Sequence, residues 1–475
     1  MERHALRARP NLIYVFADQL RLDACGYAGD RRAQTPNLDR LAGESMNFAN
    51  AVSGHPVCAP YRASLFTGKY TTSTGMVINE ISMNPNHRGF GHVLTEGGYE
   101  TGYIGKWHLS ANELGHHYET RNSYTPPGEH RLGFDGFWAA YNFHHEYYGM
   151  YYHTDSPAKI PMEGYEPDGQ TDMAIGQLRR MAGEDRPFAL FLSYGTPHDP
   201  WTPDNVPAEY LARFADAGFG LPPNYRDAND PHADAWARMT PEERASIPDW
   251  LRVYYAMTAN LDWNLGRLLA AVDELGLRDD TVFVFTSDHG ELFGAHGRKG
   301  KNIFYEEAVR VPFLLRQPGR VPQGETDVCL NTCDIMPTLL GLLDLPVPAE
   351  VEGSDLSPFA LGAGGEEPEA AFLQGTGATA DWADGHEWRA LRDKRYTYAI
   401  YRADRQELLF DHEEDPYQLR NLAEDPRCAA ELERFRALLA RRMNEIGDTF
   451  ESCTWYRDHW TEDRRILRTA TLAAK

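Results

Sequence analysis

Short apolar runs that end in polar side chains recur along the chain. The run 11–19 (NLIYVFADQ) is apolar until Asp18 and Gln19, a pattern typical of a buried parallel strand. The same pattern recurs in three further runs, at 99–108 (YETGYIGKWH), 187–198 (PFALFLSYGTPH) and 281–290 (TVFVFTSDHG). Ligands of open α/β sheets bind beyond the carboxyl ends of the strands. The polar residues that close these runs are therefore expected to share one site.

Helical patterns separate these runs. A helix is expected after Thr35, which can cap it, with Pro36 at its first position. A longer helix covers 248–277, where apolar residues recur at helical spacing and Gly276 marks the end. Alternating strands and helices predict an α/β fold with a large, mostly parallel sheet sandwiched by helices.

The pattern changes after 360–370 (ALGAGGEEPEA), a stretch rich in Gly, Glu and Pro that suits a linker. Two β-rich runs, 395–401 and 407–411, are joined by a polar turn and predict a hairpin. The run 429–446 has the pattern of an amphipathic helix. We therefore predict a large domain over 1–364 that holds the site. A smaller C-terminal α+β subdomain, an antiparallel sheet plus a helix, is predicted over 365–475.

The charge of the chain limits its partners. Among 475 residues, Lys and Arg number 47 and Asp and Glu number 70, which gives a formal net charge of −23. Such a chain is not expected to bind nucleic acid or an anionic membrane surface. The N-terminal MERHALRARP lacks the apolar core of a secretion signal, and no apolar run approaches the ~18 residues of a spanning helix. A cytoplasmic protein is the expectation.

Two kinds of polar group follow the apolar runs. Carboxylate, amide and imidazole groups suit a divalent cation such as Ca²⁺ or Mg²⁺, and they come from Asp18, Gln19, Asp288 and His289. Cationic and imidazole groups suit an oxyanion, and they come from Arg62, Lys106, His108, His198 and Lys301. Any one of these residues alone is more simply a turn residue, a surface lysine or a structural histidine. Their recurrence at several strand ends favours a site that binds a divalent cation and an oxyanion.

Cys58 stands out among six cysteines that are scattered without metal-binding spacing. It lies in HPVCAPYRASLFTG (55–68), at the expected start of a helix through Ala63 and Leu65. Backbone N–H groups at a helix start favour an anion, which suggests a thiolate nucleophile. A soft thiolate is an odd neighbour for a hard cation. We therefore hypothesise that the sulfur is replaced.

The stretch from Cys58 to Arg62 (CAPYR), followed by Thr67 and Gly68, resembles the signature of the type I, formylglycine-dependent sulfatases of the alkaline phosphatase superfamily. Similar segments follow in the same order: ADQ, GYIGKWHL, GTPHDPW, TSDHGE, KNIFYEEAVRVPFLL, CDIMPTLLGLL and LLFDHEEDPYQLRNLAED. In that family a maturation enzyme oxidises the cysteine of C-x-P-x-R to Cα-formylglycine, whose hydrated aldehyde is the nucleophile.

The resemblance implies a role for each site residue. The metal, Ca²⁺ or alternatively Mg²⁺ or Mn²⁺, would be held by Asp18, Gln19, Asp288, His289 and an oxygen of modified Cys58. Arg62 would steady the formylglycine, and Lys106 and Lys301 would bind sulfate oxygens. His108 would assist the diol and the later release of sulfate, and His198 would protonate the leaving alcohol.

One common family pattern has an aspartate after Asp18 and an asparagine after Asp288, where this chain has Gln19 and His289. That pair resembles choline-sulfatase-like enzymes and phosphonate monoester hydrolases. Lys106 and His108 in GKWH favour a sulfatase. The leading prediction is hydrolysis of a sulfate monoester of a carbohydrate. The alternatives are a phosphonate monoester hydrolase or phosphodiesterase, a choline-sulfatase-like enzyme, or a non-catalytic metal- or glycan-binding protein in which Cys58 stays a thiol.

The alcohol part of the substrate is expected to meet the aromatic stretch 138–155. We predict that His144, His145 and Tyr147 approach the substrate, although aromatic packing is the simpler interpretation of most residues there. Trp388 and Arg389 of the C-terminal hairpin region are weaker candidates for the rim of the pocket.

Overall fold

The computed structural model describes residues 9–111 and 113–472, and within them the largest sheet has eight strands in the order β10-β2-β9-β8-β1-β7-β3-β4. β9 runs antiparallel to both of its neighbours, whereas β1 pairs in parallel with β7 and β8. The predicted mostly parallel sheet is thereby confirmed. The strands are β1 (Asn11–Ala17), β2 (Met46–Val52), β3 (Glu100–Lys106), β4 (Phe137–Tyr141), β7 (Phe188–Ser193), β8 (Thr281–Ser287), β9 (Phe313–Arg316) and β10 (Gly324–Asn331).

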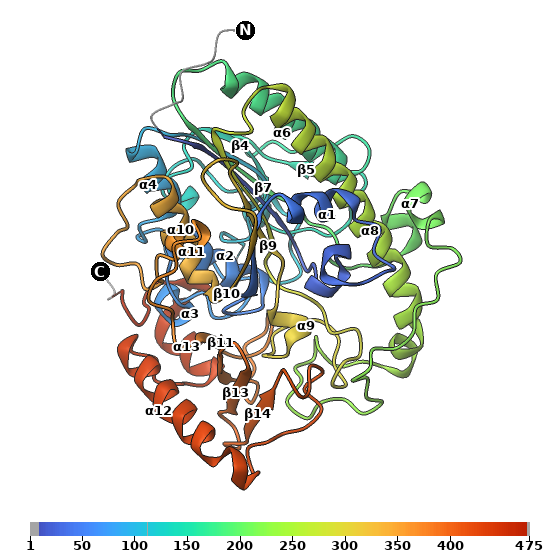
Figure 1. The fold of residues 1–475 in the computed structure, drawn as a ribbon, viewed down its shortest axis with the longest axis vertical. Coiled ribbons are helices and arrows are strands. Elements are labelled where there is room, and N and C mark those ends of the chain that lie inside the picture. The colour runs from blue at the N-terminus through green and yellow to red at the C-terminus, as the bar shows by residue number, and fades with distance from the viewer. Residues whose placement is uncertain (1–8, 112, 473–475) are drawn as a thin grey trace.

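Helices cover both faces of this sheet (Figure 1). Successive strand side chains point to opposite faces, and in β1 Tyr14 and Phe16 join one core cluster while Ile13 and Val15 join the other. Because both faces of β1 are buried, its sequence is continuously apolar. The first cluster includes α2 (Cys58–Thr67), α4 (Phe90–Glu96) and α10 (Thr332–Leu342). The second includes α1 (Pro36–Gly43), α6 (Glu166–Ala182) and α8 (Pro241–Glu274).

The helix starts differ in part from the predictions. α1 begins at Pro36 as expected, but the Thr35 hydroxyl does not cap it, because this group donates to Asp39 and accepts from the Gly26 N–H. α8 begins earlier than predicted, at Pro241, and keeps Pro248 inside. Its start is a reciprocal capping box in which the Thr240 hydroxyl accepts from the Glu243 N–H at 3.2 Å and the Glu243 carboxylate accepts from the Thr240 N–H at 2.8 Å.

The C-terminal region forms a second, antiparallel sheet in the order β11-β12-β13-β14, below the large sheet in Figure 1. The predicted hairpin is β13 and β14, and the predicted helix is α12. One face of this sheet packs on α12 through Phe372 and Phe435, and the other packs on Phe304 and Val52 through Leu373. The division near residue 364 stays a prediction. The elements are β11 (Ala371–Gly375), β12 (Trp388–Arg392), β13 (Tyr396–Tyr401), β14 (Glu407–Asp411) and α12 (Ala429–Glu445).

The remaining α-helices and β-strands are short, with at most eight residues each. They are α3 (Thr71–Thr74), α5 (Thr120–Ser123), β5 (Tyr151–Tyr152), β6 (Ile160–Pro161), α7 (Ala208–Ala212), α9 (Glu306–Val309), α11 (Ser357–Ala360), α13 (Cys453–Trp460), β15 (Thr461–Glu462) and β16 (Arg465–Ile466).

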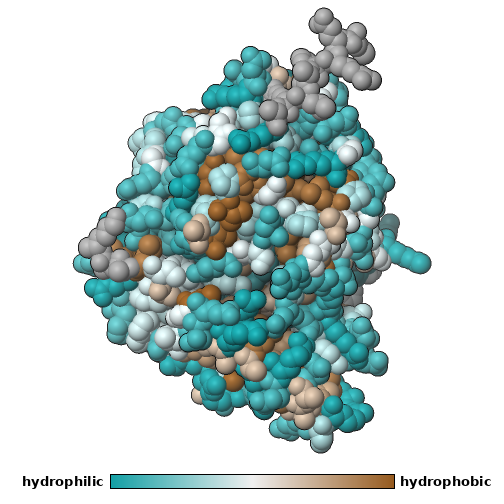
Figure 2. All heavy atoms as spheres, turned by 60° about the vertical axis from the view of Figure 1, so that its left-hand side comes forward, coloured by the Kyte–Doolittle hydropathy of each residue, from teal (hydrophilic) through white to brown (hydrophobic). Residues whose placement is uncertain are grey.

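The face in Figure 2 is mostly hydrophilic, with hydrophobic groups gathered in its upper half. None of the described helices has both the length and the apolar content to cross a membrane. The basic stretch 1–8 lies outside the described residues.

Candidate active site

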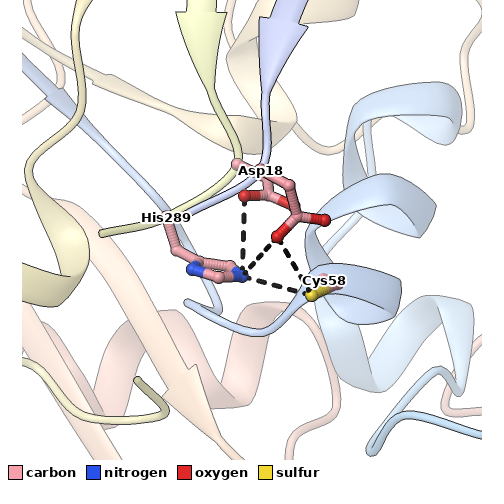
Figure 3. Close-up of side chains that lie close together, drawn as sticks. Asp18, Cys58 and His289 are labelled. Carbon is pink, nitrogen blue, oxygen red and sulfur yellow. Dashed lines mark hydrogen bonds and ion pairs between the residues drawn. The ribbon is translucent and has the colours of Figure 1, made fainter. Parts of the chain in front are cut away.

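The site lies where two strands end and one helix begins. Asp18 follows β1, Asp288 and His289 follow β8, and Cys58 is the first residue of α2. All four side chains are buried, and one ligand atom from each lies within 4.8 Å of the others. Figure 3 shows Asp18, Cys58 and His289 pointing toward one another from these elements. The structure therefore brings together four residues that the sequence analysis selected for a metal site.

The two carboxylates share Arg62 on one side and face His289 on the other. Arg62 Nη2 lies 3.2 Å from Asp18 Oδ2 and 3.3 Å from Asp288 Oδ2. The Oδ1 atoms of the same carboxylates lie 3.8 and 3.5 Å from His289 Nε2. Asp288 Oδ1 also accepts from the Gln19 backbone N–H at 3.0 Å, and each Oδ1 atom keeps a lone pair that a cation can use. Two carboxylate oxygens with an imidazole beside them form a donor set that fits Ca²⁺, Mg²⁺ or Mn²⁺.

Electrostatics at the site also fit a cation. Burial and the neighbouring Asp18 charge raise the pKa of Asp288. Burial would raise the pKa of Asp18 too, but Lys106 and other nearby cationic groups hold it well below its ordinary value. Two buried carboxylates side by side repel each other when both are ionised, and a divalent ion between them removes that repulsion.

Cys58 does not have the environment of a reactive thiolate. Burial and the Asp18 carboxylate raise the pKa of the Cys58 thiol, so the start of α2 does not stabilise a thiolate here. Cys58 Sγ lies 3.3 Å from His289 Nε2 and 3.6 Å from Asp18 Oδ1. A group attached at this position therefore lies beside the metal ligands. This geometry agrees with the hypothesis that the sulfur is exchanged for oxygen.

Gln19 is oriented by a residue that the sequence analysis did not select. The Gln19 amide nitrogen donates to Glu291 Oε2 at 2.7 Å, so its Oε1 faces Lys301 at 2.8 Å. Glu291 is held in turn by the backbone N–H groups of Phe293 and Gly300. The sequence did hold a signal for Glu291, because it is the last residue of the family-like segment TSDHGE.

Gly290 permits a close approach of two backbone segments. A Cβ at Gly290 would lie 1.9 Å from the backbone oxygen of Glu307, a distance that no side chain tolerates. The Gly290 and Glu291 N–H groups can therefore donate to the Ala308 and Glu307 carbonyls, at 2.8 and 3.0 Å, which fixes the backbone that carries Glu291.

The predicted cations converge on the same place. Lys106 Nζ lies 2.6 Å from Asp18 Oδ2. Lys301 Nζ lies 3.1 Å from Cys58 Sγ and 2.7 Å from His198 Nε2. His108 follows β3 and its Nε2 lies 3.0 Å from Glu80 Oε1. Two lysines and His198 thus gather around Asp18 and Cys58, as an oxyanion site requires, whereas the polar contact of His108 is with Glu80.

A cavity of about 410 Å³ opens beside the candidate metal ligands. Its inner end includes Gln19, His198 and Lys301, and its walls include the aromatic side chains of Phe143, Trp201, Trp236 and Trp250. Trp236 is 48% exposed, whereas His198 is 7% exposed. The cavity therefore leads from an aromatic surface to the buried ionic groups.

The residues predicted to approach the substrate divide into two groups. His145 lines the cavity and stacks on His198, with ring centroids 3.7 Å apart. His144 and Tyr147 do not line it. His144 Nε2 lies 3.3 Å from Glu166, and the Tyr147 hydroxyl donates to the backbone oxygens of Gly195 and His198. Tyr147 therefore holds the loop that carries His198.

Trp388 and Arg389 are not at the rim of the pocket, and that prediction is wrong. Both side chains are fully buried. The Trp388 indole donates to the Asn302 carbonyl at 3.2 Å, and Arg389 forms an ion pair with Asp448. Alternation along β12 points them to opposite faces of the small sheet, and both faces are covered by other parts of the chain.

The large sheet with its helices, together with the small antiparallel sheet, forms the alkaline phosphatase-like fold of solved sulfatases, and its buried ionic site has a donor set that suits a divalent cation. Sequence profiles agree: that of the family named Sulfatase matches residues 10–345, and that of the C-terminal part of N-sulphoglucosamine sulphohydrolase matches 294–446. The chain belongs to the sulfatase family and is a sulfuric ester hydrolase.

Three relatives illustrate the similarity. An ulvan-active sulfatase of Formosa agariphila is 37% identical over 453 residues, which are 94% of this chain and 84% of the relative. An endo-4-O-sulfatase of Bacteroides thetaiotaomicron is 30% identical over 96% of this chain and 95% of its own. A solved Bacteroides thetaiotaomicron protein from the metabolism of multiple glycosaminoglycans has a TM-score of 0.78 and 27% identity, covering 95% of this chain and 98% of its own.

Proposed function

We propose that this sulfatase hydrolyses a sulfate monoester of a carbohydrate and that Cys58 is the precursor of its formylglycine nucleophile. The observation that carries the proposal is the position of Lys301. Its Nζ lies 3.1 Å from Cys58 Sγ, 2.7 Å from His198 Nε2 and 2.8 Å from Gln19 Oε1. The Lys301 ammonium group therefore contacts the proposed nucleophile position, the proposed general acid and one proposed metal ligand at the same time.

Each group has a distinct task in this proposal. Formylglycine at residue 58 supplies the hydrated aldehyde that attacks sulfur, and the divalent cation, Ca²⁺ or alternatively Mg²⁺ or Mn²⁺, supplies charge neutralisation. The cation would be held by Asp18, Gln19, Asp288 and His289, together with an oxygen of modified residue 58.

The surrounding side chains bind the ester and move protons. Lys106 and Lys301 bind the sulfate oxygens, where negative charge lies in both the ester and its transition state. His198 protonates the departing alcohol, and its Nε2 is already placed beside Lys301. Arg62 holds the Asp18 and Asp288 carboxylates and the group at residue 58, and His108 assists the release of sulfate.

The cavity supports a carbohydrate as the alcohol. Aromatic faces at Trp236, Trp250 and Phe143 offer stacking surfaces for a sugar ring. The imidazole of His117, which is 20% exposed and lines the same cavity, offers a partner for hydroxyl groups. Ulvan, in the name of one relative, and glycosaminoglycans, in the description of the solved relative, are carbohydrates and support the same class.

The test begins with the nucleophile. The protein is co-expressed with a formylglycine-generating maturation enzyme, and the intact mass of the peptide that contains Cys58 is measured. Conversion of the CH₂SH side chain to CHO is expected, and Cys58→Ala is the matched control. A peptide that keeps its sulfur under these conditions contradicts the proposed nucleophile.

The second part of the test compares substrates. Sulfated oligosaccharides are assayed beside 4-nitrophenyl sulfate, choline sulfate, a phosphonate monoester and a phosphate diester. The highest kcat/KM is expected on a sulfated oligosaccharide. A preference for the phosphorus substrates, or for choline sulfate, would replace the proposed substrate class with the corresponding alternative.

A further inference from the structure

Glu80 lies beside the cavity in a backbone conformation that the surrounding structure maintains. Its φ is 58°, in the left-handed region. Arg464 Nε donates to the Glu80 carbonyl at 2.6 Å, and the Asn79 N–H donates to the Thr379 carbonyl at 2.8 Å. Strained residues that neighbouring contacts hold in place are typical of functional sites.

The preceding residue connects this turn to the nucleophile position. Asn79 Oδ1 accepts a hydrogen bond from the Ala59 N–H at 2.9 Å, and Ala59 follows Cys58 at the start of α2. Residues 79 and 80 therefore connect the start of α2 to the side chains that the Glu80 carboxylate contacts.

The Glu80 carboxylate contacts two histidines. Its Oε1 lies 3.0 Å from His108 Nε2 and 3.3 Å from His117 Nε2. Glu80 is 2% exposed and His108 is 1% exposed. His108 Nδ1 has no hydrogen-bond partner among residues 9–111 and 113–472. One ring nitrogen of His108 is thus engaged by a carboxylate, and the other is available.

This arrangement selects the tautomer of His108. An ionised carboxylate only accepts hydrogen bonds, so His108 Nε2 must carry the hydrogen. Burial lowers the pKa of His108 to about 4, and its ring is therefore neutral near pH 7. Burial would raise the pKa of Glu80, but its histidine partners bring it to about 2, so the carboxylate is ionised. In a neutral ring with the hydrogen on Nε2, Nδ1 has a free lone pair.

We propose that Glu80 is a positioning residue that holds His108 as the Nε2–H tautomer, leaving Nδ1 as a proton acceptor of the site. The proposal rests on the proposed function, in which His108 assists the release of sulfate. A proton accepted at Nδ1 converts His108 to an imidazolium, and the adjacent Glu80 carboxylate stabilises that positive charge. The arrangement is the one by which a carboxylate orients a catalytic histidine in other hydrolases.

The first test measures the tautomer in protein whose Cys58 is unmodified, so it needs no activity. Histidine ¹⁵N chemical shifts are recorded at pH 7, and loss of a signal set in His108→Gln assigns His108. The Nε2–H tautomer is expected in the wild type, and a mixture of tautomers is expected in Glu80→Ala. The matched control is Asp404→Asn, because Asp404 Oδ2 lies 3.0 Å from His232 Nε2 in another carboxylate–histidine pair. This control is expected to change the His232 signals and not those of His108.

The second test is kinetic and uses the formylglycine-bearing enzyme. Glu80→Gln and Glu80→Ala are expected to lower kcat about 10- to 100-fold, as is usual when the partner of an active-site histidine is removed. KM is expected to stay within about twofold, because the contact acts through His108. Asp404→Asn is expected to keep the wild-type kcat, and melting temperatures check that each variant is folded.

The outcomes separate the two proposals. An Nδ1–H tautomer in the wild type, or a kcat of both Glu80 variants within about twofold of the wild type, overturns the role of Glu80. If no variant and no wild-type sample hydrolyses a sulfate ester, the proposed function fails. The tautomer measurement then still decides whether Glu80 positions His108.

Discussion

His198 is the residue whose removal best tests the direction of proton transfer. It lines the cavity, and its Nε2 contacts Lys301. His198→Gln is expected to lower kcat on a sulfated oligosaccharide about 10²- to 10⁴-fold, the usual contribution of a general acid. A much smaller loss is expected on 4-nitrophenyl sulfate, because nitrophenolate departs without protonation. Parallel kcat measurements check this, and equal losses on both substrates would contradict a general-acid role.

Trp236 offers a residue-level test of sugar binding. Its ring is 48% exposed and lines the cavity. Trp236→Ala is expected to raise KM for a sulfated oligosaccharide about fivefold, since aromatic stacking contributes about 1 kcal/mol. Trp263 is the matched control, because it is 42% exposed on α8 but does not line the cavity. A KM that Trp263→Ala raises as much as Trp236→Ala would refute a specific stacking role.

At the scale of elements, a buried ion pair joins β12 to the segment after α12. Arg389 Nη2 lies 2.8 Å from Asp448 Oδ1, and neither side chain is exposed. Gln374 of β11 donates to the other Asp448 oxygen at 2.7 Å. Asp448→Ala is expected to lower the free energy of unfolding by about 3–5 kcal/mol, because it leaves the buried Arg389 charge without a counter-charge. Denaturant unfolding measures this change.

An exposed ion pair supplies the control for that experiment. Arg441 and Glu369 form a pair in which both side chains are about half exposed, and Glu369→Ala is expected to cost at most about 1 kcal/mol. A loss for Asp448→Ala that is no larger than this value would show that the buried pair does not hold the small sheet.

The same pair predicts a pH dependence. Burial would raise the pKa of Asp448, but Arg389 outweighs it and lowers that pKa. A carboxyl whose pKa is lower in the folded state stabilises the fold above its unfolded pKa of about 4. This stabilisation is lost as the pH falls through the folded pKa. The difference in unfolding free energy between the wild type and Asp448→Ala should therefore be large at pH 7. It should shrink as the pH falls below 4 and through the folded pKa of Asp448.

At the scale of the whole molecule, the metal site is expected to contribute to stability. Its ligands follow β1 and β8 and include the first residue of α2, so a bound ion joins segments that separate on unfolding. Ca²⁺ at about 100 times its Kd should raise the free energy of unfolding by about 2.7 kcal/mol over chelated protein. Melting temperatures with EDTA, Ca²⁺, Mg²⁺ and Mn²⁺ measure the effect. Asp288→Ala should abolish it, and ion-independent melting of the wild type would contradict a metal site.

Local patterns in the sequence were sufficient to predict the large, mostly parallel sheet and the helices that cover it. A strand buried on both faces must be continuously apolar, so runs such as 11–19 identified the central strands before any contact was known. β2, β4, β9 and β10 carried weaker patterns and were not predicted, because partial exposure or short length reduces the signal. The motif around Cys58 and the polar ends of the strands were also sufficient to select the residues that gather at the site.

The contacts that orient those residues could be known only from the tertiary structure. Glu80 carries no sequence signal, and its place beside His108 depends on how two loops pack. His144, His145 and Tyr147 stand almost next to one another, yet only His145 among them lines the cavity. Irregular backbone has no fixed period from which the direction of a side chain could be inferred. The sequence by itself therefore determined the family, the large sheet and the chemistry of the site. Long-range packing decided which side chains line the cavity and which ones orient the residues of the site.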